Sequence, residues 1–163
     1  MTKERYIAQM CFWQSRKKLL RAASAIQKLA EITVYIIYPL FVTYLFIKGD
    51  IVWLYSMLDC GLGFIAISIL RKLLNKPRPY EKYEMAPAVK KDTKGCSFPS
   101  RHAFSAAVIA VNICAVYGAV GLVVLALAII IAVLRVLLGL HFVKDVLSGL
   151  AIGILVGSFI FLA

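Results

Sequence analysis

The sequence predicts an all-α fold: a polytopic bundle of about five transmembrane helices, preceded by an amphipathic helix at the membrane interface. Hydrophobic residues make up 62% of the 163-residue chain. The mean hydropathy of +0.86 is far above that of a typical soluble domain. A membrane-spanning helix needs about 20 apolar residues, which leaves room for four or five crossings in one domain. We therefore expect an integral membrane protein.

The beginning of the chain is expected to form a basic amphipathic segment over residues 1–30. Aromatic and aliphatic side chains are mixed with basic ones over about residues 9–30, a pattern typical of a helix that lies in the membrane interface. The clean apolar core of a cleavable signal peptide is not evident there. The four cysteines are scattered along the chain, so neither a zinc site nor a disulfide framework is indicated.

Residues 31–163 are expected to form the transmembrane domain. Its first crossing covers about residues 32–47, and its second covers 51–74 after a tight polar turn. A polar loop with several prolines follows over residues 75–99. The remaining apolar runs predict crossings at about residues 101–117, 121–140 and 145–163. The third and fourth crossings share so few residues that they must form a tight hairpin.

The net charge of +11 comes mainly from two basic clusters, one from Arg16 to Lys28 and the other from Arg71 to Arg101. Basic residues beside membrane helices attract anionic lipid headgroups and orient the protein in the bilayer. The expected partners are therefore membrane lipids. A nucleic acid partner is not expected, because no soluble module remains to present a binding surface.

The last third of the chain carries its charge in one short stretch. After His102, every Lys, Arg, His, Asp and Glu falls within residues 134–145. A charged group beside the bilayer is costly, so such a stretch is a functional hypothesis by default. On a helix, Asp145 would share a face with His141, where its carboxylate can orient the imidazole as a nucleophile or base. A purely structural hydrogen bond between the two remains an alternative at this point.

A second cluster lies where the third crossing begins. Ser100 precedes an apolar run and is a natural helix N-cap, with Arg101 and His102 in the first turn. Free backbone amides at a helix N-terminus bind anions, and these side chains add a hydroxyl, a guanidinium and a proton donor. Plain capping beside an interfacial arginine is the alternative, and it explains Ser100 but not His102.

A third cluster, Arg71, Lys72 and Arg78, follows the second crossing. Taken alone, these cations are explained equally well as an orientation signal. The number of crossings between any two of the three clusters is zero or two. All three clusters are therefore expected on the same membrane face, where they can converge into one site.

Taken together, the three clusters resemble a known family. Their order is Arg71-x6-Arg78-Pro79, then Pro99-Ser100-Arg101-His102, then Arg135-x5-His141-x3-Asp145. This order is similar to the motifs of the type 2 phosphatidic acid phosphatase (PAP2) superfamily, and specifically to its small bacterial-type membrane lipid phosphatases. Three positions depart from the family pattern: Arg71 replaces lysine with Lys72 beside it, Arg101 replaces glycine, and Leu134 replaces serine.

The resemblance implies a metal-independent lipid phosphate phosphatase that works through a phosphohistidine intermediate. His141 would attack phosphorus, Asp145 would orient its imidazole, and His102 would protonate the leaving group. The phosphate would be bound by Arg71, Lys72, Arg78, Ser100, Arg101 and Arg135. No metal or other cofactor is expected, because a magnesium site requires carboxylates and the one acid in the three clusters is already paired with the histidine.

The implied substrate is a lipid phosphomonoester or diphosphate. Undecaprenyl diphosphate, phosphatidylglycerophosphate and phosphatidic acid all fit, and the sequence does not choose among them. Two alternatives stay open: a membrane phosphotransferase with the same site, and a transporter in which Arg135, His141 and Asp145 form an ion or proton relay. The soluble haloperoxidases of the superfamily are excluded by the hydropathy.

The expected location is a bacterial cell (inner) membrane that the chain crosses several times, with the oligomeric state left open. Members of the family generally carry the site on the outer face. The positive-inside rule would instead place the basic loop over residues 75–99 in the cytoplasm. We adopt the family expectation, because several of these cations are assigned to phosphate.

Asp59 lies near the middle of the second crossing, about 18 Å along the helix from Arg71. This distance is too great for a direct catalytic role. Asn112 is expected at a similar depth in the third crossing, so we expect a structural hydrogen bond between the two side chains.

Overall fold

The structure is a computed structural model that describes residues 2–91 and 93–162. Its helices confirm the all-α fold. No strand occurs in these described ranges. The helices are α1 (Lys3–Ser15), α2 (Lys17–Lys48), α3 (Val52–Leu74), α4 (Pro79–Lys82), α5 (Arg101–Tyr117), α6 (Ala119–Leu137) and α7 (Val143–Gly157), followed by a short 3₁₀ helix over Ser158–Leu162. The last residue of the expected fifth crossing lies outside the described residues.

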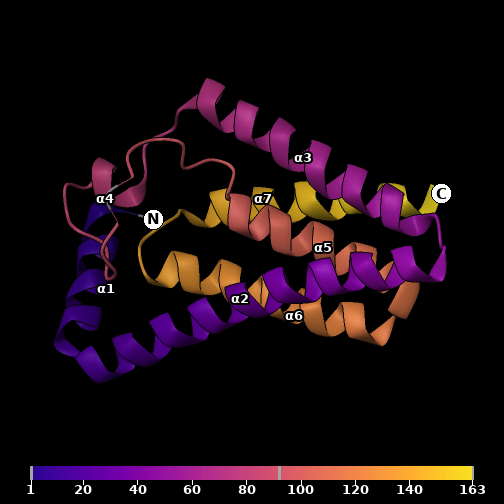
Figure 1. Cartoon of the computed structure of the whole chain (residues 1–163). Helices are drawn as coiled ribbons and strands as arrows, with labels where there is room; N and C mark the ends of the chain where they lie inside the picture. The colour runs from indigo at the N-terminus through magenta and orange to yellow at the C-terminus, as the bar shows by residue number, and fades with distance from the viewer. Residues whose placement is uncertain (1, 92, 163) are drawn as a thin grey trace.

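Four helical segments are long and apolar enough to cross a membrane, and the chain is an integral membrane protein. These segments are Lys17–Lys48, Val52–Lys82, Ala119–Leu137 and Val143–Phe161. The remaining expected crossing, α5, is apolar but has only 17 residues. It packs against α2, α3, α6 and α7 at the centre of the bundle (Figure 1), and most of its side chains are buried.

The N-terminal segment differs from the expected single amphipathic helix over residues 9–30. The break falls at Arg16, whose backbone is not helical (φ −117°, ψ 61°), and α2 then continues without interruption as one helix of 32 residues. Consequently α2 includes both the second half of the expected interfacial helix and the expected first crossing. The shorter α1 buries Tyr6, Met10 and Trp13 against the rest of the protein instead of lying free on the membrane surface.

Side chains of α1 bind the carboxyl end of α6. The last carbonyls of a helix have no partner within the helix. Gln9 donates through Nε2 to the carbonyls of Val136 and Leu137 at 2.9 and 2.6 Å. The hydroxyl of Tyr6 donates to the carbonyl of Gly139 at 3.3 Å. These bonds hold the connection between α6 and α7, which carries one of the predicted site residues.

Small residues allow α5 and α7 to pack backbone to backbone. A Cβ atom at Gly149 would lie 2.5 Å from the carbonyl oxygen of Ser100, and one at Gly153 would lie 2.5 Å from that of Phe104. Such close approach is typical of membrane helices with glycine every fourth residue. The backbone amide of Ser100 donates to the carbonyl of Asp145 at 2.8 Å. The glycines therefore bring the beginnings of α5 and α7 together.

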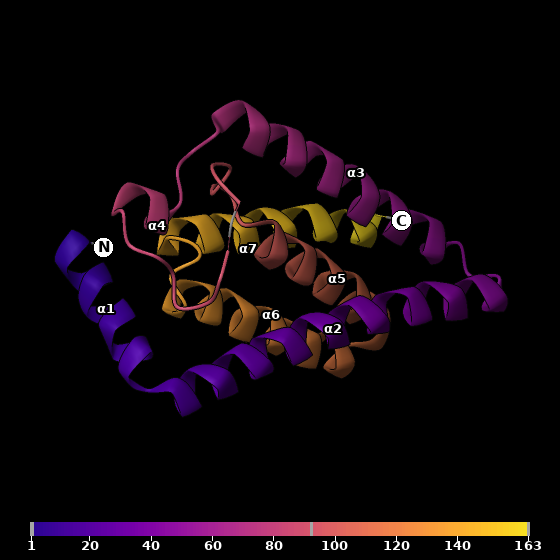
Figure 2. The ribbon, with the colours of Figure 1, turned by 60° about the vertical axis from the view of Figure 1, so that its left-hand side comes forward.

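The connections that carry the three polar clusters all lie at one end of the bundle. At the left of Figure 1, this end holds α1, α4, the long connection between α4 and α5, and the connection between α6 and α7. Both ribbon views show α3 leaning away from α5 and α7 toward this end (Figure 2). The expected convergence of the clusters on one face is thus observed.

Candidate active site

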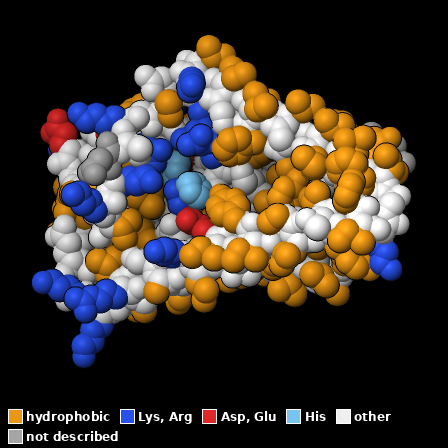
Figure 3. All heavy atoms as spheres, in the orientation of Figure 1, with side chains coloured by type: hydrophobic (Ala, Val, Ile, Leu, Met, Phe, Trp, Pro, Cys, Tyr) orange, Lys and Arg blue, Asp and Glu red, His pale blue; other side chains and the backbone are white. Residues whose placement is uncertain are grey.

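A group of buried polar side chains occupies the end of the bundle where α3 ends and where α5 and α7 begin. Its members are Arg71, Arg78, Ser97, Ser100, Arg135, His141 and Asp145, each at most 6% exposed. Buried charged residues are rare unless they are paired or functional. In the space-filling view, a hollow contains histidine and acidic side chains and has lysine and arginine at its edge (Figure 3).

His141 and Asp145 lie side by side, as expected, although they do not share one helix. His141 belongs to the connection before α7, and Asp145 is in the first turn of that helix. Nδ1 of the imidazole is 3.6 Å from Oδ2 of the carboxylate. The same oxygen accepts the backbone N–H of Phe142 at 3.0 Å. The carboxylate is therefore fixed by its own helix terminus and faces the Nδ1 side of the ring.

Ser97 is a member of this group that the sequence interpretation missed. Its hydroxyl donates to Oδ2 of Asp145 at 2.5 Å and lies 3.4 Å from Nδ1 of His141. The residue is completely buried. Its backbone amide also donates to the carbonyl of Lys76 at 2.8 Å. Ser97 thus bonds to the orienting carboxylate and links the beginning of the α3–α4 connection to the histidine.

Arg71 and Arg78 are each held by backbone carbonyls of the connection before α5. Nη1 of Arg71 donates to the carbonyls of Ser97, at 3.4 Å, and of Pro99. Nε of Arg78 donates to the carbonyl of Gly95 at 3.1 Å. The Nη1 atom of Arg78 is buried and has no hydrogen-bond partner. These neutral acceptors fix the guanidinium groups without neutralising them.

Arg135 is held differently, by a carboxylate. Its Nη1 atom lies 2.7 Å from Oε1 of Glu31 on α2, and its Nε atom is buried without a partner. A buried donor without an acceptor costs about 1–3 kcal/mol, and more for a charged group. Two such donors, Nη1 of Arg78 and Nε of Arg135, therefore favour an anion that supplies the missing acceptors.

The other predicted phosphate ligands are less enclosed. Lys72 is exposed, whereas its neighbour Arg71 is buried. Arg101 is also exposed, and its guanidinium lies over the ring of Phe64 at 5.5 Å from the centroid. Ser100 is completely buried, and its hydroxyl accepts the backbone N–H three residues later at 3.5 Å, as expected for an N-cap.

His102 follows in the first turn of α5 and is partly buried. It lies close enough to Arg135 and His141 to interact with both electrostatically. Lys91, in the connection before α5, also interacts with Arg135 and with Arg78. This lysine carried no motif that could single it out from the other loop lysines.

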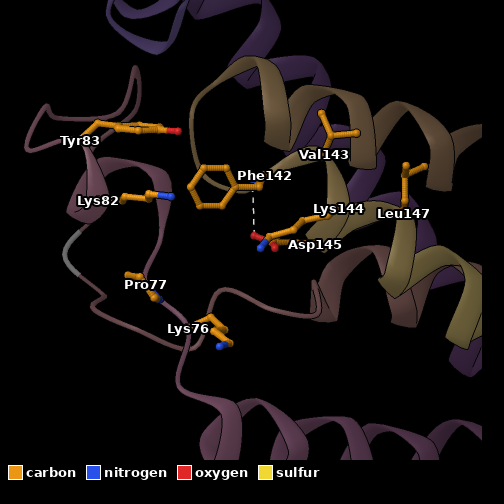
Figure 4. Close-up of a pocket in the computed structure, with 9 residues that line it drawn as sticks. All are labelled: Lys76, Pro77, Lys82, Tyr83, Phe142, Val143, Lys144, Asp145 and Leu147. Carbon is orange, nitrogen blue, oxygen red and sulfur yellow. Dashed lines mark hydrogen bonds between the residues drawn. The ribbon is translucent and has the colours of Figure 1, made fainter. Parts of the chain in front are cut away.

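A cavity of about 730 Å³ adjoins Asp145. Its wall combines three lysines with apolar side chains of α7 and the residue before it (Figure 4). The side chains that face it include Lys76, Lys82, Phe142, Val143, Lys144 and Leu147. Space for ligand or water is therefore present beside the carboxylate.

Asp59 is remote from this group. Its side chain interacts with Asn112, as expected, and with the backbone near the end of the chain. Nδ2 of Asn112 also donates to the carbonyl of Gly157 at 3.3 Å. Together these contacts join α3, α5 and α7 within the bundle. Asp59 therefore contributes to the packing of these helices.

Burial lowers the pKa of the His141 imidazole to about 4. The hydrogen-bonding carboxylate of Asp145 opposes this shift, and the positive charges of Arg135 and Arg78 add to it. The unperturbed pKa is about 6.5. The ring is therefore neutral at pH 7, with a lone pair available for attack on an electrophile.

The acidic limb of the pH–rate profile is expected far below the usual range for histidine. The active, neutral form of His141 is present above the lowered pKa and is lost only as the pH falls through about 4. The value of kcat/KM reports groups of the free enzyme, so it should be measured from about pH 3 to pH 8, which covers both sides of the expected midpoint. A phosphorus NMR titration gives the fraction of substrate phosphate in each ionisation state at each pH. Dividing kcat/KM by the fraction in the reactive state removes the contribution of the substrate from the profile. A corrected midpoint near pH 6.5 would contradict the burial of this ring.

Comparisons with known proteins agree with this arrangement. The family model of the PAP2 superfamily matches residues 51–163, more than half of the chain. The crystal structure of Aquifex aeolicus LpxE is similar over 89% of this chain and 86% of that chain, with 25% identity and a TM-score of 0.71. A transmembrane PAP2 type phosphatidylglycerolphosphate phosphatase from Bacillus subtilis is similar over 99% of this chain and 86% of that one, with 23% identity and a TM-score of 0.66. A search of curated proteins finds no match.

Proposed function

We propose that this chain, which belongs to the PAP2 superfamily, is a membrane phosphatase that removes phosphate from a lipid through a phosphohistidine intermediate. One observation carries the proposal. Two buried guanidinium donors without acceptors, on Arg78 and Arg135, lie in the same buried group as a histidine that is neutral at pH 7. A phosphoryl group supplies acceptors for the donors and an electrophile for the histidine.

In the first step, Nε2 of His141 attacks phosphorus, because Nδ1 faces Asp145 and Ser97. The N–P bond forms as the bond from phosphorus to the leaving oxygen breaks, and that oxygen takes the electron pair. His102 donates a proton to it. In the second step, His102 removes a proton from water, whose oxygen attacks phosphorus. The N–P bond then breaks and restores the free imidazole.

The cations supply most of the catalysis in this proposal. Phosphoryl transfer depends mainly on positioning and on stabilising the charge of the equatorial oxygens. Arg71, Arg78 and Arg135 are already fixed by protein acceptors, so little reorganisation is needed when phosphate binds. Ser100 adds a buried hydroxyl at the beginning of α5. We assign Lys72 and Arg101, both exposed, to the approach of the anionic headgroup.

The lipid tail has a candidate binding place between α2, α3 and α5. A cavity of about 770 Å³ there is lined mostly by apolar side chains, among them Tyr35, Tyr38, Val42, Phe64, Ile65 and Ile109. One lining residue, Tyr35, also interacts electrostatically with Arg135 of the polar group. An apolar cavity near the cations supports a substrate whose phosphate is attached to a long apolar chain.

We propose that the reaction requires no metal ion. A magnesium ion in phosphoryl transfer is held by carboxylates. Of the carboxylates named at this site, Asp145 is bonded to Ser97 and Glu31 is bonded to Arg135. No group of three or more His, Cys, Asp and Glu side chains suited to a metal occurs in the part of the chain that the structure describes. We further propose a bacterial inner membrane, with the site on its outer face.

Purified protein in detergent is expected to release inorganic phosphate from at least one of phosphatidic acid, phosphatidylglycerophosphate and undecaprenyl diphosphate. Release should continue in excess EDTA. Vanadate should inhibit it, because the ion mimics pentavalent phosphorus bound to a histidine. The measurement is phosphate release against time, with heat-denatured protein as the blank. Release from none of the three lipids, or only after addition of a divalent metal, would overturn the proposal.

A further inference from the structure

The pairing of Glu31 with Arg135 extends the site beyond the segment that matches the family. That segment begins at residue 51, whereas Glu31 lies on α2. Within the described residues, this is the one ion pair between an arginine and a carboxylate, and its nitrogen and oxygen atoms are 2.7 Å apart. The arginine side chain is only 4% exposed. The Glu31 side chain is partly buried, at 20% exposed. Ionised side chains on membrane helices are rare, so a pair with one buried partner is a functional hypothesis by default.

The pair uses one end of the guanidinium and leaves the other end free. Glu31 accepts from Nη1 of Arg135, whereas Nε is buried and has no acceptor. A guanidinium binds phosphate best through two neighbouring N–H groups. With Nη1 occupied, the edge formed by Nε and Nη2 remains available for a phosphoryl group. The carboxylate therefore orients the arginine and leaves the binding edge unoccupied.

Glu31 is itself held in place by α2. Nε2 of Gln27, one turn earlier, donates to the same carboxylate oxygen at 3.0 Å. Tyr35, one turn later, interacts electrostatically with both Glu31 and Arg135. Residues four apart on a helix share one face. Along α2, these three side chains form a polar stripe that faces the end of α6.

We propose that Glu31 is a positioning residue that sets the orientation of the Arg135 guanidinium for phosphoryl transfer. The inference rests on the proposed function, since it assigns phosphate to Arg135. It also assigns α2 a role in the reaction that none of the three sequence motifs includes.

The test is a double-mutant cycle measured as kcat/KM for the lipid substrate that the wild type hydrolyses. Glu31→Gln is expected to lower kcat/KM about tenfold and Glu31→Ala about a hundredfold, because a displacement of 1 Å costs about two orders of magnitude. In the Arg135→Ala background, Glu31→Gln should change kcat/KM less than twofold, because the group through which it acts is gone. Lys28→Ala, an exposed charge change on the same helix, is the matched control and should stay within twofold of wild type.

Vanadate provides a second measurement if the Arg135→Ala variants turn over too slowly. The increase in melting temperature with vanadate gives its dissociation constant in every variant that folds. We expect weaker vanadate binding in Glu31→Gln than in the wild type. The double variant should bind vanadate no more weakly than Arg135→Ala alone. Additive losses would overturn the proposal and indicate a structural role. Tighter vanadate binding in Glu31→Gln would also overturn it, because Glu31 would then compete with phosphate. If the wild type hydrolyses none of the lipids, the proposed function fails first, and the cycle is not needed to show it.

Discussion

His141→Ala is expected to reduce kcat for phosphate release by a factor on the order of 10⁵ or more, which is the typical effect of removing a nucleophile. The physical reason is that the N–P bond can no longer form, so the cations stabilise a transition state that lacks its nucleophile. About 10³–10⁴-fold acceleration over water should remain from binding and charge stabilisation alone. In a rapid-quench experiment with a lipid that carries radioactive phosphorus, the wild-type protein should become labelled transiently. The label should be acid-labile, as expected for a phosphohistidine. His141→Ala should carry none.

The companion variant His102→Ala separates attack from protonation of the leaving group. It should lose hydrolysis of alkyl phosphates, whose leaving oxygen needs a proton. It should retain much more of its activity toward an aryl phosphate such as p-nitrophenyl phosphate, whose leaving group departs without one. Lys144→Ala, beside the same cavity, controls for a general change of charge. Label that persists in His141→Ala would contradict the nucleophile assignment.

Gly149→Ala is expected to lower activity at least a hundredfold, although the residue touches no substrate. Its new Cβ atom would lie 2.5 Å from the carbonyl oxygen of Ser100, so α5 and α7 must separate. That movement would break the 2.8 Å bond from the amide of Ser100 to the carbonyl of Asp145 and displace the carboxylate from His141. Overpacking of this kind also costs about 1–3 kcal/mol of stability.

The measurement is kcat/KM together with the melting temperature in detergent. Gly61→Ala is the stability control, because a Cβ atom there meets nothing within 4 Å. In a helix interior, alanine is favoured over glycine by about 0.5–1 kcal/mol, so this control should be neutral or slightly stabilising. Full activity in Gly149→Ala would show that α5 and α7 can separate without moving the catalytic groups.

The sequence predicted the parts of the site that belong to local motifs. Long apolar runs predicted the helices, and the number of crossings between clusters predicted that Arg71, Ser100 and His141 would meet. The prediction failed where local rules do not apply. Helical spacing was the reason given for the contact between His141 and Asp145, but α6 ends at Leu137 and the histidine lies in the connection that follows. The contact forms because the connection folds back, with the amide of His141 bonded to the carbonyl of Arg135 at 3.2 Å.

Two other residues could not be predicted because their partners are distant in the sequence. Ser97 is a serine in a polar loop, and its bond to Asp145 spans 48 residues. Glu31 lies in a basic amphipathic segment, where an acidic side chain has an ordinary explanation. Its partner, Arg135, is 104 residues away. Such pairs depend on how α2 packs against α6 and on how the connection before α5 packs against α7. Hydrophobic periodicity does not specify this packing.

The docking of α1 on the end of α6 has a consequence for biosynthesis. The bond from Tyr6 to the carbonyl of Gly139 spans 133 residues, which a ribosome adds in about 7 to 27 s at about 5 to 20 residues per second. During that interval, the buried side chains of α1 lack the part of their packing surface that Leu138 and Leu140 provide. The nascent helix is then expected to rest in the headgroup region until α6 is inserted. Although α1 is made before α6, it therefore reaches its final position only after α6.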